Sequence, residues 1–178
     1  MPKEFIALVF GALGILANAV IFQQKTGKKL LICKLISDVL WAIYYLLLGG
    51  YSAAMIAGIG VLRESIFLNQ GKKWADSPLW FLLFAAFAVL SGLLTATSLW
   101  ALLPMTASLL SVYSFRKAKP RLARILAYPI SGCMLLYDII VLGALGTVGM
   151  INEGMTLIST TVALAKTLPR RPSNEDLP

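Results

Sequence analysis

QQKTGKK, Gln23 to Lys29, is the stretch that decides the fold, because it is a short basic connection between two long apolar runs. Three more basic connections follow it, and the connections that alternate with them contain no Lys or Arg. The basic connections are 23–29, 70–77, 116–122 and the tail after 166, and the others are GGYS (49–52), TATS (95–98) and ALGTVG (144–149). Lys and Arg collect on the cytoplasmic side of membrane proteins. The alternation therefore predicts an odd number of membrane spans, with the N-terminus outside and the C-terminus in the cytoplasm.

The composition supports an integral membrane protein. Of the 178 residues, 58% are hydrophobic and 13% are charged, and the mean hydropathy is +0.80. A soluble domain carries roughly 25% charged residues. The net charge of +8 lies in short clusters between apolar runs, so it indicates membrane topology, and we expect no nucleic-acid partner.

The residue types also argue against an enzyme. The chain has no histidine, which excludes imidazole chemistry, and it has no G-x-S-x-G elbow and no P-loop. Cys33 and Cys133 both lie in apolar runs, where single cysteines are small core residues. We therefore expect no disulfide, no metal site and no cofactor.

Cutting the apolar runs at Gly, Pro and charge clusters gives an all-α polytopic protein with seven transmembrane helices. The predicted spans are 4–22, 30–48, 52–69, 78–94, 98–115, 123–142 and 147–166. Most contain about 17–20 residues, which at a rise of 1.5 Å per residue just crosses a core of about 30 Å. The count depends on the cut at TATS, because a six-span chain would place the 116–121 cluster outside.

A cleaved signal peptide is an alternative for the first span. ALVFGALGILANA (7–19) has an apolar core and ends in an Ala-x-Ala-like site. Cleavage there would place the basic connection 23–29 outside, which disfavours this alternative.

The spans show a weak internal repeat at an offset of 94 residues. Ser37 falls on Ser131, Gly60 on Gly154 and Ser65 on Ser159, and the basic connections match in length and charge. The repeat predicts three helices, one linker helix and three helices again, so both triplets have the same orientation. The predicted regions are 1–69 (first triple-helix repeat), 70–97 (linker with the fourth helix), 98–166 (second repeat) and 167–178 (disordered cytoplasmic tail).

This 3+1+3 arrangement resembles the SWEET and PQ-loop superfamily. More narrowly, LLLGGYSAAMIAGIGVLRE (46–64), with MINEG (150–154) in the other half, resembles the bacterial inner-membrane YgjV family over roughly residues 8–166. The resemblance implies a SWEET-like fold in a bacterial inner membrane, but no particular substrate. The superfamily's Pro-Gln pair is absent, and Gly60 and Ser159–Thr161 stand where SWEET sugar carriers have asparagine, so sugar transport does not follow.

Five charged residues fall inside the predicted spans, where each costs roughly 2.5–3.5 kcal/mol and normally faces the bundle interior. Asp38 and Arg63 lie about 12 and 9 Å from the inner ends of their helices, so we expect them to form an ion pair. Adjacent residues on a helix point about 100° apart, so we do not expect Arg63 to pair with Glu64. Glu64 is expected to face Asn18 or the cytoplasm. The alternative is that Arg63 and Asp38 only fix helix register.

Asp138 and Glu153 lie about 6 and 9 Å from the outer ends of their helices. Like charges at similar depth repel each other if they are close, so this pair could carry a proton. The alternative is that both simply reach the outer interface. Polar or aromatic residues share a helix face with these acids and complete the predicted pathway: Trp41 with Asp38, and Thr156 and Thr160 with Glu153.

The repeat and the intramembrane charges favour a small-solute transporter, passive or proton-coupled, with its site between the two triplets. The expected partners are the lipid bilayer, an unknown small solute and, if transport is coupled, protons; a homo-oligomer is left open. The alternative is a membrane receptor or interaction protein on the same fold, because a fold does not fix a function.

Overall fold

The computed structural model describes residues 3–47, 51–95, 99–142 and 147–167. Within these ranges the chain forms seven α-helices and no strand, which confirms the predicted helical class and the order of the seven helices. Their bounds are α1 Lys3–Ile21, α2 Gly27–Leu47, α3 Tyr51–Phe67, α4 Pro78–Thr95, α5 Leu103–Lys117, α6 Pro120–Tyr137 and α7 Thr147–Ala165. A 3-10 turn, η1 (Leu99–Leu102), precedes α5, and a π-helical segment, η2 (Asp138–Leu142), continues α6.

The predicted break near TATS is present. α4 ends at Thr95 and the described chain resumes at Leu99 in η1, so a single helix through 78–115 is wrong. Two predictions lie largely outside the described residues: the connection ALGTVG (144–149), of which 144–146 are not described, and the disordered tail (167–178), which is not described from 168 onward.

Local sequence explains how α5 and α6 begin. Pro104 and Pro120 occupy the first turns of these helices, where a missing N–H costs no hydrogen bond. Between them Ala118 adopts a left-handed conformation (φ 46°), and its N–H bonds to the carbonyl of Phe115. This cap lets the chain reverse within two residues.

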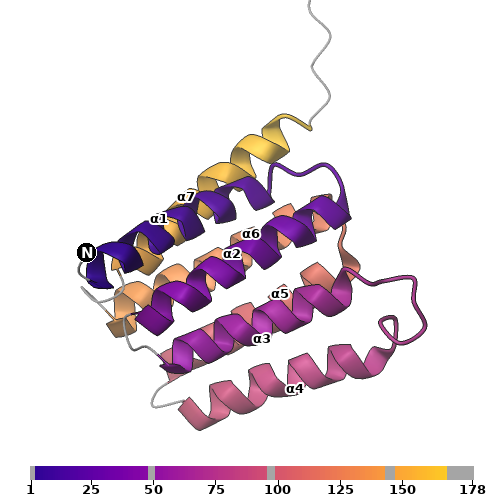
Figure 1. Ribbon diagram of the computed structural model, residues 1–178, viewed down its shortest axis with the longest axis horizontal. Helices are drawn as coiled ribbons and strands as arrows, with labels where there is room; N and C mark the ends of the chain where they lie inside the picture. The colour runs from indigo at the N-terminus through magenta and orange to yellow at the C-terminus, as the bar shows by residue number, and fades with distance from the viewer. Residues whose placement is uncertain (1–2, 48–50, 96–98, 143–146, 168–178) are drawn as a thin grey trace, which may run out of the picture.

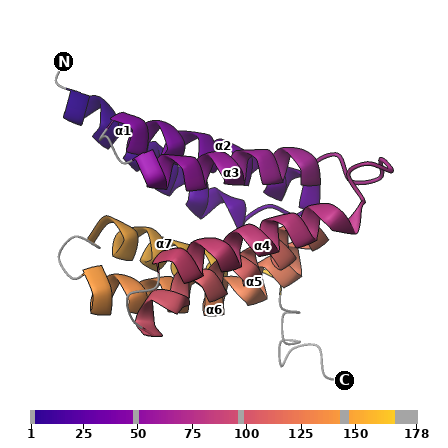
Figure 2. The same ribbon diagram turned by 90° about the horizontal axis from the view of Figure 1, so that it is seen from below.

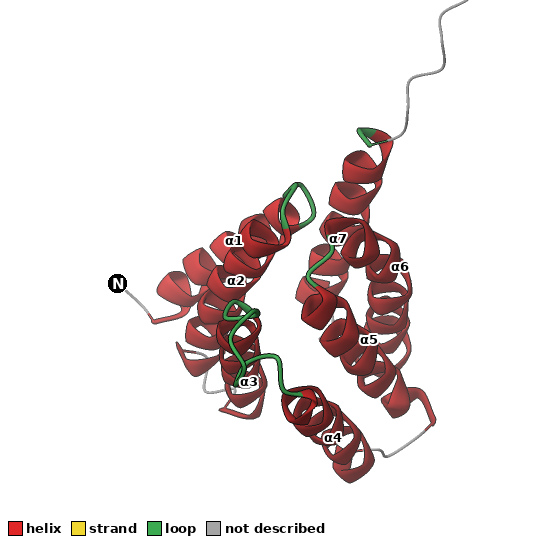
Figure 3. Cartoon of the chain, turned by 90° about the vertical axis from the view of Figure 1, so that its right-hand side faces the viewer, coloured by secondary structure: helices red, strands yellow, loops and turns green. Residues whose placement is uncertain are grey.

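The helices pack in two layers. α2 lies between α1 and α3 in one layer, and α6 lies between α5 and α7 in the other, with α4 packed against α5 (Figure 1). The layers touch along α1 and α7 and along α3 and α5. Figure 2 shows the two layers edge-on, and Figure 3 shows them end-on.

The surface is apolar and the interior is partly polar. Large apolar side chains are exposed on all seven helices, whereas the buried residues include Asp38, Glu64, Arg124 and Asp138. By length and composition alone, three segments in the described ranges are long and apolar enough to cross a membrane: Gly27–Leu47, Pro120–Val141 and Thr147–Ala165. Phe5–Ile21 and Pro78–Leu90 are shorter apolar helices. The seven-span count stays a prediction.

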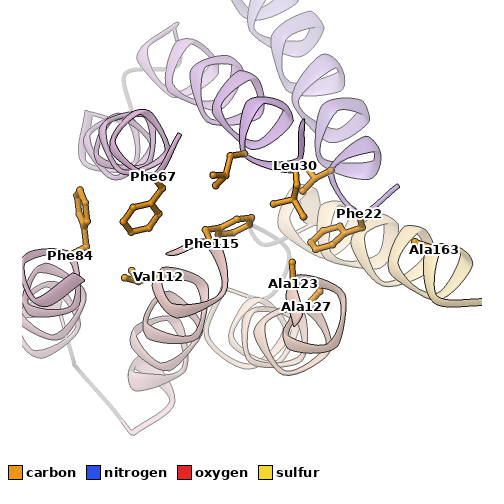
Figure 4. Close-up of a cluster of buried hydrophobic side chains, with 11 residues drawn as sticks. Phe22, Leu30, Phe67, Phe84, Val112, Phe115, Ala123, Ala127 and Ala163 are labelled. Atoms are coloured by element: carbon orange, nitrogen blue, oxygen red, sulfur yellow. The ribbon is translucent and has the colours of Figure 1, made fainter. Parts of the chain in front are cut away.

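A buried apolar cluster joins all seven helices at one end of the molecule. We call this end the basic end, because the connections 22–26, 68–77 and 118–119 lie there (Figure 1). Phe22, Phe67, Phe84 and Phe115 are its aromatic members (Figure 4). Its other members are Ile21, Leu30, Leu31, Val112, Ala123, Ala127 and Ala163. The cluster therefore holds the two layers together at the basic end.

Candidate functional site

Arg63 and Glu64 pair with each other, contrary to the sequence-based expectation. Arg63 Nη2 lies 2.9 Å from Glu64 Oε1, and Arg63 Nε lies 3.1 Å from the same oxygen. The Glu64 side chain is completely buried. The backbone directions of adjacent residues differ, but both side chains are long enough to bend together. An unpaired charge in the interior would cost several kcal/mol, so the pair forms despite its unfavourable spacing.

Asp38 pairs with Lys34 of its own helix, so the predicted Asp38–Arg63 ion pair is wrong. Lys34 Nζ donates to Asp38 Oδ1, while Asp38 Oδ2 is buried and has no hydrogen-bond partner among the described residues. In the sequence Lys34 lies just beyond the first basic connection, 23–29, whose charges indicate membrane topology. The spacing of four residues was a local signal that could have found this pair.

These four residues form one electrostatic unit, which we call the charge cluster (Lys34, Asp38, Arg63 and Glu64). Asp38 and Lys34 both act electrostatically on Glu64, as Asp38 does on Arg63. Phe115 of the other layer closes the cluster: its ring centroid lies 5.8 Å from Lys34 Nζ and 5.7 Å from Arg63 Cζ. Both distances suit cation–π attraction. The cluster therefore contacts the second layer through an aromatic ring.

Gly60 makes room for Asp38. A Cβ placed on Gly60 would lie 2.5 Å from Asp38 Oδ2 and 3.0 Å from its carboxyl carbon. The aspartate of α2 thus occupies the position that a side chain at residue 60 of α3 would take.

A second polar group, the amide network, links α1 to α7. Asn18 Nδ2 donates to Asn152 Oδ1 at 2.9 Å and to Thr156 Oγ1 at 3.3 Å, and Asn152 Nδ2 donates to Glu153 Oε1 at 3.2 Å. The expected approach of Glu64 to Asn18 is therefore wrong, because Asn18 bonds across the layers instead. No sequence signal joins Asn18 to Asn152, which lie 134 residues apart.

Asp138 lies at the start of η2 and its side chain is buried within the chain. Its carboxyl group lies directly against Gly149 of α7. It acts electrostatically on Glu153 of α7 and on Tyr45 of α2. Gly149 precedes Glu153 by four residues, so the Asp138 carboxyl lies about one turn of α7 from Glu153.

The remaining predicted site residues are Trp41 of α2 and Thr156 and Thr160 of α7. Trp41 packs against Gly14 of α1 and stacks on Tyr45, with ring centroids 5.7 Å apart. Thr156 and Thr160 are both buried; Thr156 belongs to the amide network, and the Thr160 hydroxyl has no partner among the described residues.

Arg124 is a buried cation that sequence reasoning missed. Its Nε donates to the carbonyl of Phe22 at 2.8 Å, and its Nη2 donates to that of Gln24 at 3.0 Å. In the sequence Arg124 follows the basic connection 116–122, whose charges indicate membrane topology. The structure instead uses it to join α6 to the connection between α1 and α2.

The described residues contain no group of three His, Cys, Asp or Glu side chains that could hold a metal ion. An apolar exterior, charged residues in the interior and long apolar helices together define a helical membrane protein.

The chain belongs to the bacterial inner membrane protein family Imp-YgjV, whose family model matches residues 5–171. The membership confirms the YgjV resemblance and agrees with the expected inner-membrane location. Comparisons with curated proteins and with solved structures gave no significant match.

Proposed function

We propose that this protein transports a small solute across the inner membrane, as two parallel three-helix repeats of SWEET-like architecture joined by α4. Pairing α1 with α5, α2 with α6 and α3 with α7 relates the two halves. Under this pairing, α2 and α6 are each the central helix of their half. The contact between α1 and α7 corresponds to the contact between α5 and α3. Parallel repeats of this kind occur in transporters.

The observation that carries the proposal is the polar interior between two apolar-faced halves. The charge cluster, the amide network and Asp138 all lie between helices rather than on the exterior. Charged groups inside a membrane protein are expensive, so they mark substrate or ion pathways. Phe115 contacts the charge cluster, and the apolar cluster joins the layers at the basic end. In this proposal rocking of the halves about that end exposes the interior.

The proposed transport is passive or proton-coupled. We propose no enzymatic activity and no cofactor. The apolar faces of the helices are proposed to contact lipid in seven spans, with the N-terminus outside. A homo-oligomer is compatible with this arrangement.

Flux through proteoliposomes tests the proposal. Radiolabelled probes of three charge classes, a sugar, a carboxylate and an amine, are offered to vesicles that hold the purified protein. We expect one class to enter in a saturable way, and we expect the double variant Arg63→Gln/Glu64→Gln to abolish that entry while remaining folded. Asp76→Asn, an exposed residue outside the interior, is the matched control.

Absence of flux for every class, together with a partner protein that co-purifies in stoichiometric amount, would favour the receptor alternative. Unchanged flux in the double variant would remove the charge cluster from the pathway.

A further inference from the structure

An apolar groove of about 360 Å³ lies between α1 and α2, the first two helices of the first layer (Figure 1). Its lining side chains come from residues 13–20 of α1 and 33–40 of α2, and all of them are apolar. The groove extends about 10 Å along the helices at a rise of 1.5 Å per residue. On a membrane protein, a surface of this kind meets the acyl chains of lipids. We call it the α1–α2 groove.

Small residues form the floor of the α1–α2 groove. Ala17 and Cys33 line it and are half-buried. Leu16 and Ile36 also line it, but they are larger, are 58% and 50% exposed, and form its rims. A bulky side chain at position 17 would therefore fill the groove.

The groove points toward exposed lysines at the basic end. Lys29 precedes Cys33 by four residues and Ile36 by seven, so the three side chains lie on one face of α2. Lys25 and Lys28 belong to the same connection. All three lysines are exposed, and none forms a salt bridge with a residue in the described ranges. The apolar groove thus ends, about one turn of α2 beyond Cys33, at an uncompensated positive charge.

The surroundings of these lysines add positive rather than negative charge. The sequence contains no Asp or Glu between residues 22 and 37. Lys166, which follows α7, also approaches this connection, because its Nζ lies 3.5 Å from Gln23 Oε1. An anion that complements the lysines therefore has to come from another molecule.

We infer that the α1–α2 groove binds one anionic phospholipid of the cytoplasmic leaflet, with an acyl chain in the groove and the phosphate against Lys29. Lys25 and Lys28 add to the attraction. Basic residues beside grooves between membrane helices on the cytoplasmic side bind anionic headgroups in this way. The basic end is the end that the predicted topology places in the cytoplasm. This lipid site is separate from the proposed transport pathway, which lies between the layers.

A second copy of this chain suits the groove less well than a lipid. Copies in one membrane share the same orientation, so a dimer formed through this groove would place two connections 23–29 beside each other. Each connection carries three lysines and no acid. Like charges at short distance repel each other, whereas an anionic headgroup is attracted.

Native mass spectrometry of the purified protein, which counts the lipids that it retains, tests the inference. The probes are phosphatidylglycerol and phosphatidylcholine with identical palmitoyl and oleoyl chains, and glycerol 3-phosphate, which has no acyl chain. We expect one phosphatidylglycerol per protein, bound about tenfold or more tightly than phosphatidylcholine. Glycerol 3-phosphate should not displace it at equal concentration, because it cannot occupy the groove.

Two lysine variants test the headgroup contact. Lys29→Gln should weaken phosphatidylglycerol binding by about fivefold, which corresponds to the attraction of one lysine near the membrane surface. Lys73→Gln is the control, because it removes the same charge from an exposed lysine in another basic connection, 70–77. It should leave this binding unchanged.

A second pair of variants tests the acyl-chain contact. Ala17→Phe fills the groove and keeps every lysine, so it should weaken binding by about tenfold or more, equivalent to about two displaced methylene groups. Ala86→Phe makes the same substitution at an exposed position of α4 and should have no effect. If Ala17→Phe does not fold, the lipid and lysine comparisons decide the outcome.

Equal retention of the two phospholipids, or displacement of phosphatidylglycerol by glycerol 3-phosphate, would overturn the inference. So would equal weakening by Lys29→Gln and Lys73→Gln, or unchanged binding in a folded Ala17→Phe variant. A lipid-free dimer that Ala17→Phe separates would make a second copy the occupant and would also overturn it. Because lipid binding is measured without flux, this inference and the proposed transport fail separately.

Discussion

Asp38 of α2 lies directly against Gly60 of α3, and the contact exists because residue 60 has no side chain. The Asp38 carboxylate reaches the surface of the neighbouring helix and keeps its bond to Lys34. Any larger residue at position 60 would have to move this charged side chain.

Gly60→Ala should therefore destabilise the protein. The new methyl group would lie 2.5 Å from Asp38 Oδ2, so Asp38 must turn away and weaken its pair with Lys34. We expect a loss of about 1–3 kcal/mol in the free energy of unfolding, measured by SDS titration in mixed micelles. Gly58→Ala is the matched control and should gain about 0.5–1 kcal/mol, because alanine is the better helix former. Equal stability of the two variants would show that the Asp38–Gly60 contact is not tight.

The Arg63–Glu64 pair predicts a strongly non-additive double-mutant cycle. Arg63→Gln alone leaves a completely buried carboxylate without its cation, and we expect a loss of about 3–5 kcal/mol. Arg63→Gln/Glu64→Gln removes both charges and should recover most of that loss. The same unfolding titration measures these two variants and the single variant Glu64→Gln. Simple addition of the two single losses would mean that the residues do not interact.

Arg124 should matter far more than the neighbouring arginine of the same helix. Arg124→Gln removes charged hydrogen bonds to the carbonyls of Phe22 and Gln24, which should cost about 1.5–3 kcal/mol. Arg121 is exposed, so Arg121→Gln should change stability by less than about 0.5 kcal/mol. If both variants lose the same stability, Arg124 acts only through its charge at the membrane surface.

The predicted topology has its own test. Reporter fusions after residues 50, 96 and 146 should all report the outer side of the membrane, and fusions after 70 and 118 should report the cytoplasm. Alkaline phosphatase and green fluorescent protein activities give the two readings. A cytoplasmic result at any of the first three positions would break the seven-span arrangement.

The helices could be predicted because their signals are local. Apolar runs of about 17–20 residues and the Gly, Pro and charge clusters between them give seven helices, with bounds close to those observed. The continuation of α6 by the π-helical segment from Asp138 was not predicted, since nothing in the apolar run distinguishes a wide turn from an ordinary one.

The partners of the charged residues were harder to predict, because a long charged side chain can reach several oppositely charged groups and its sequence position does not decide between them. Depth along the helix paired Asp38 with the wrong cation, since Asp38 binds Lys34 rather than Arg63. The four-residue spacing of Lys34 and Asp38 on α2 is a local signal for their pairing. The bond of Asn18 to Asn152 depends on how the two layers meet, so no pattern within one helix could reveal it.

The apolar cluster at the basic end also determines which end of each layer can move further. It clamps all seven helices near one end, and a helix of 19 residues such as α1 or α7 extends about 28 Å from end to end. If a layer turns by about 10° around that clamp, its free end sweeps about 5 Å, as follows from the helix rise. A small change in the packing of Phe115 within the cluster would thus accompany a much larger movement at the opposite ends of the helices, near Asp138.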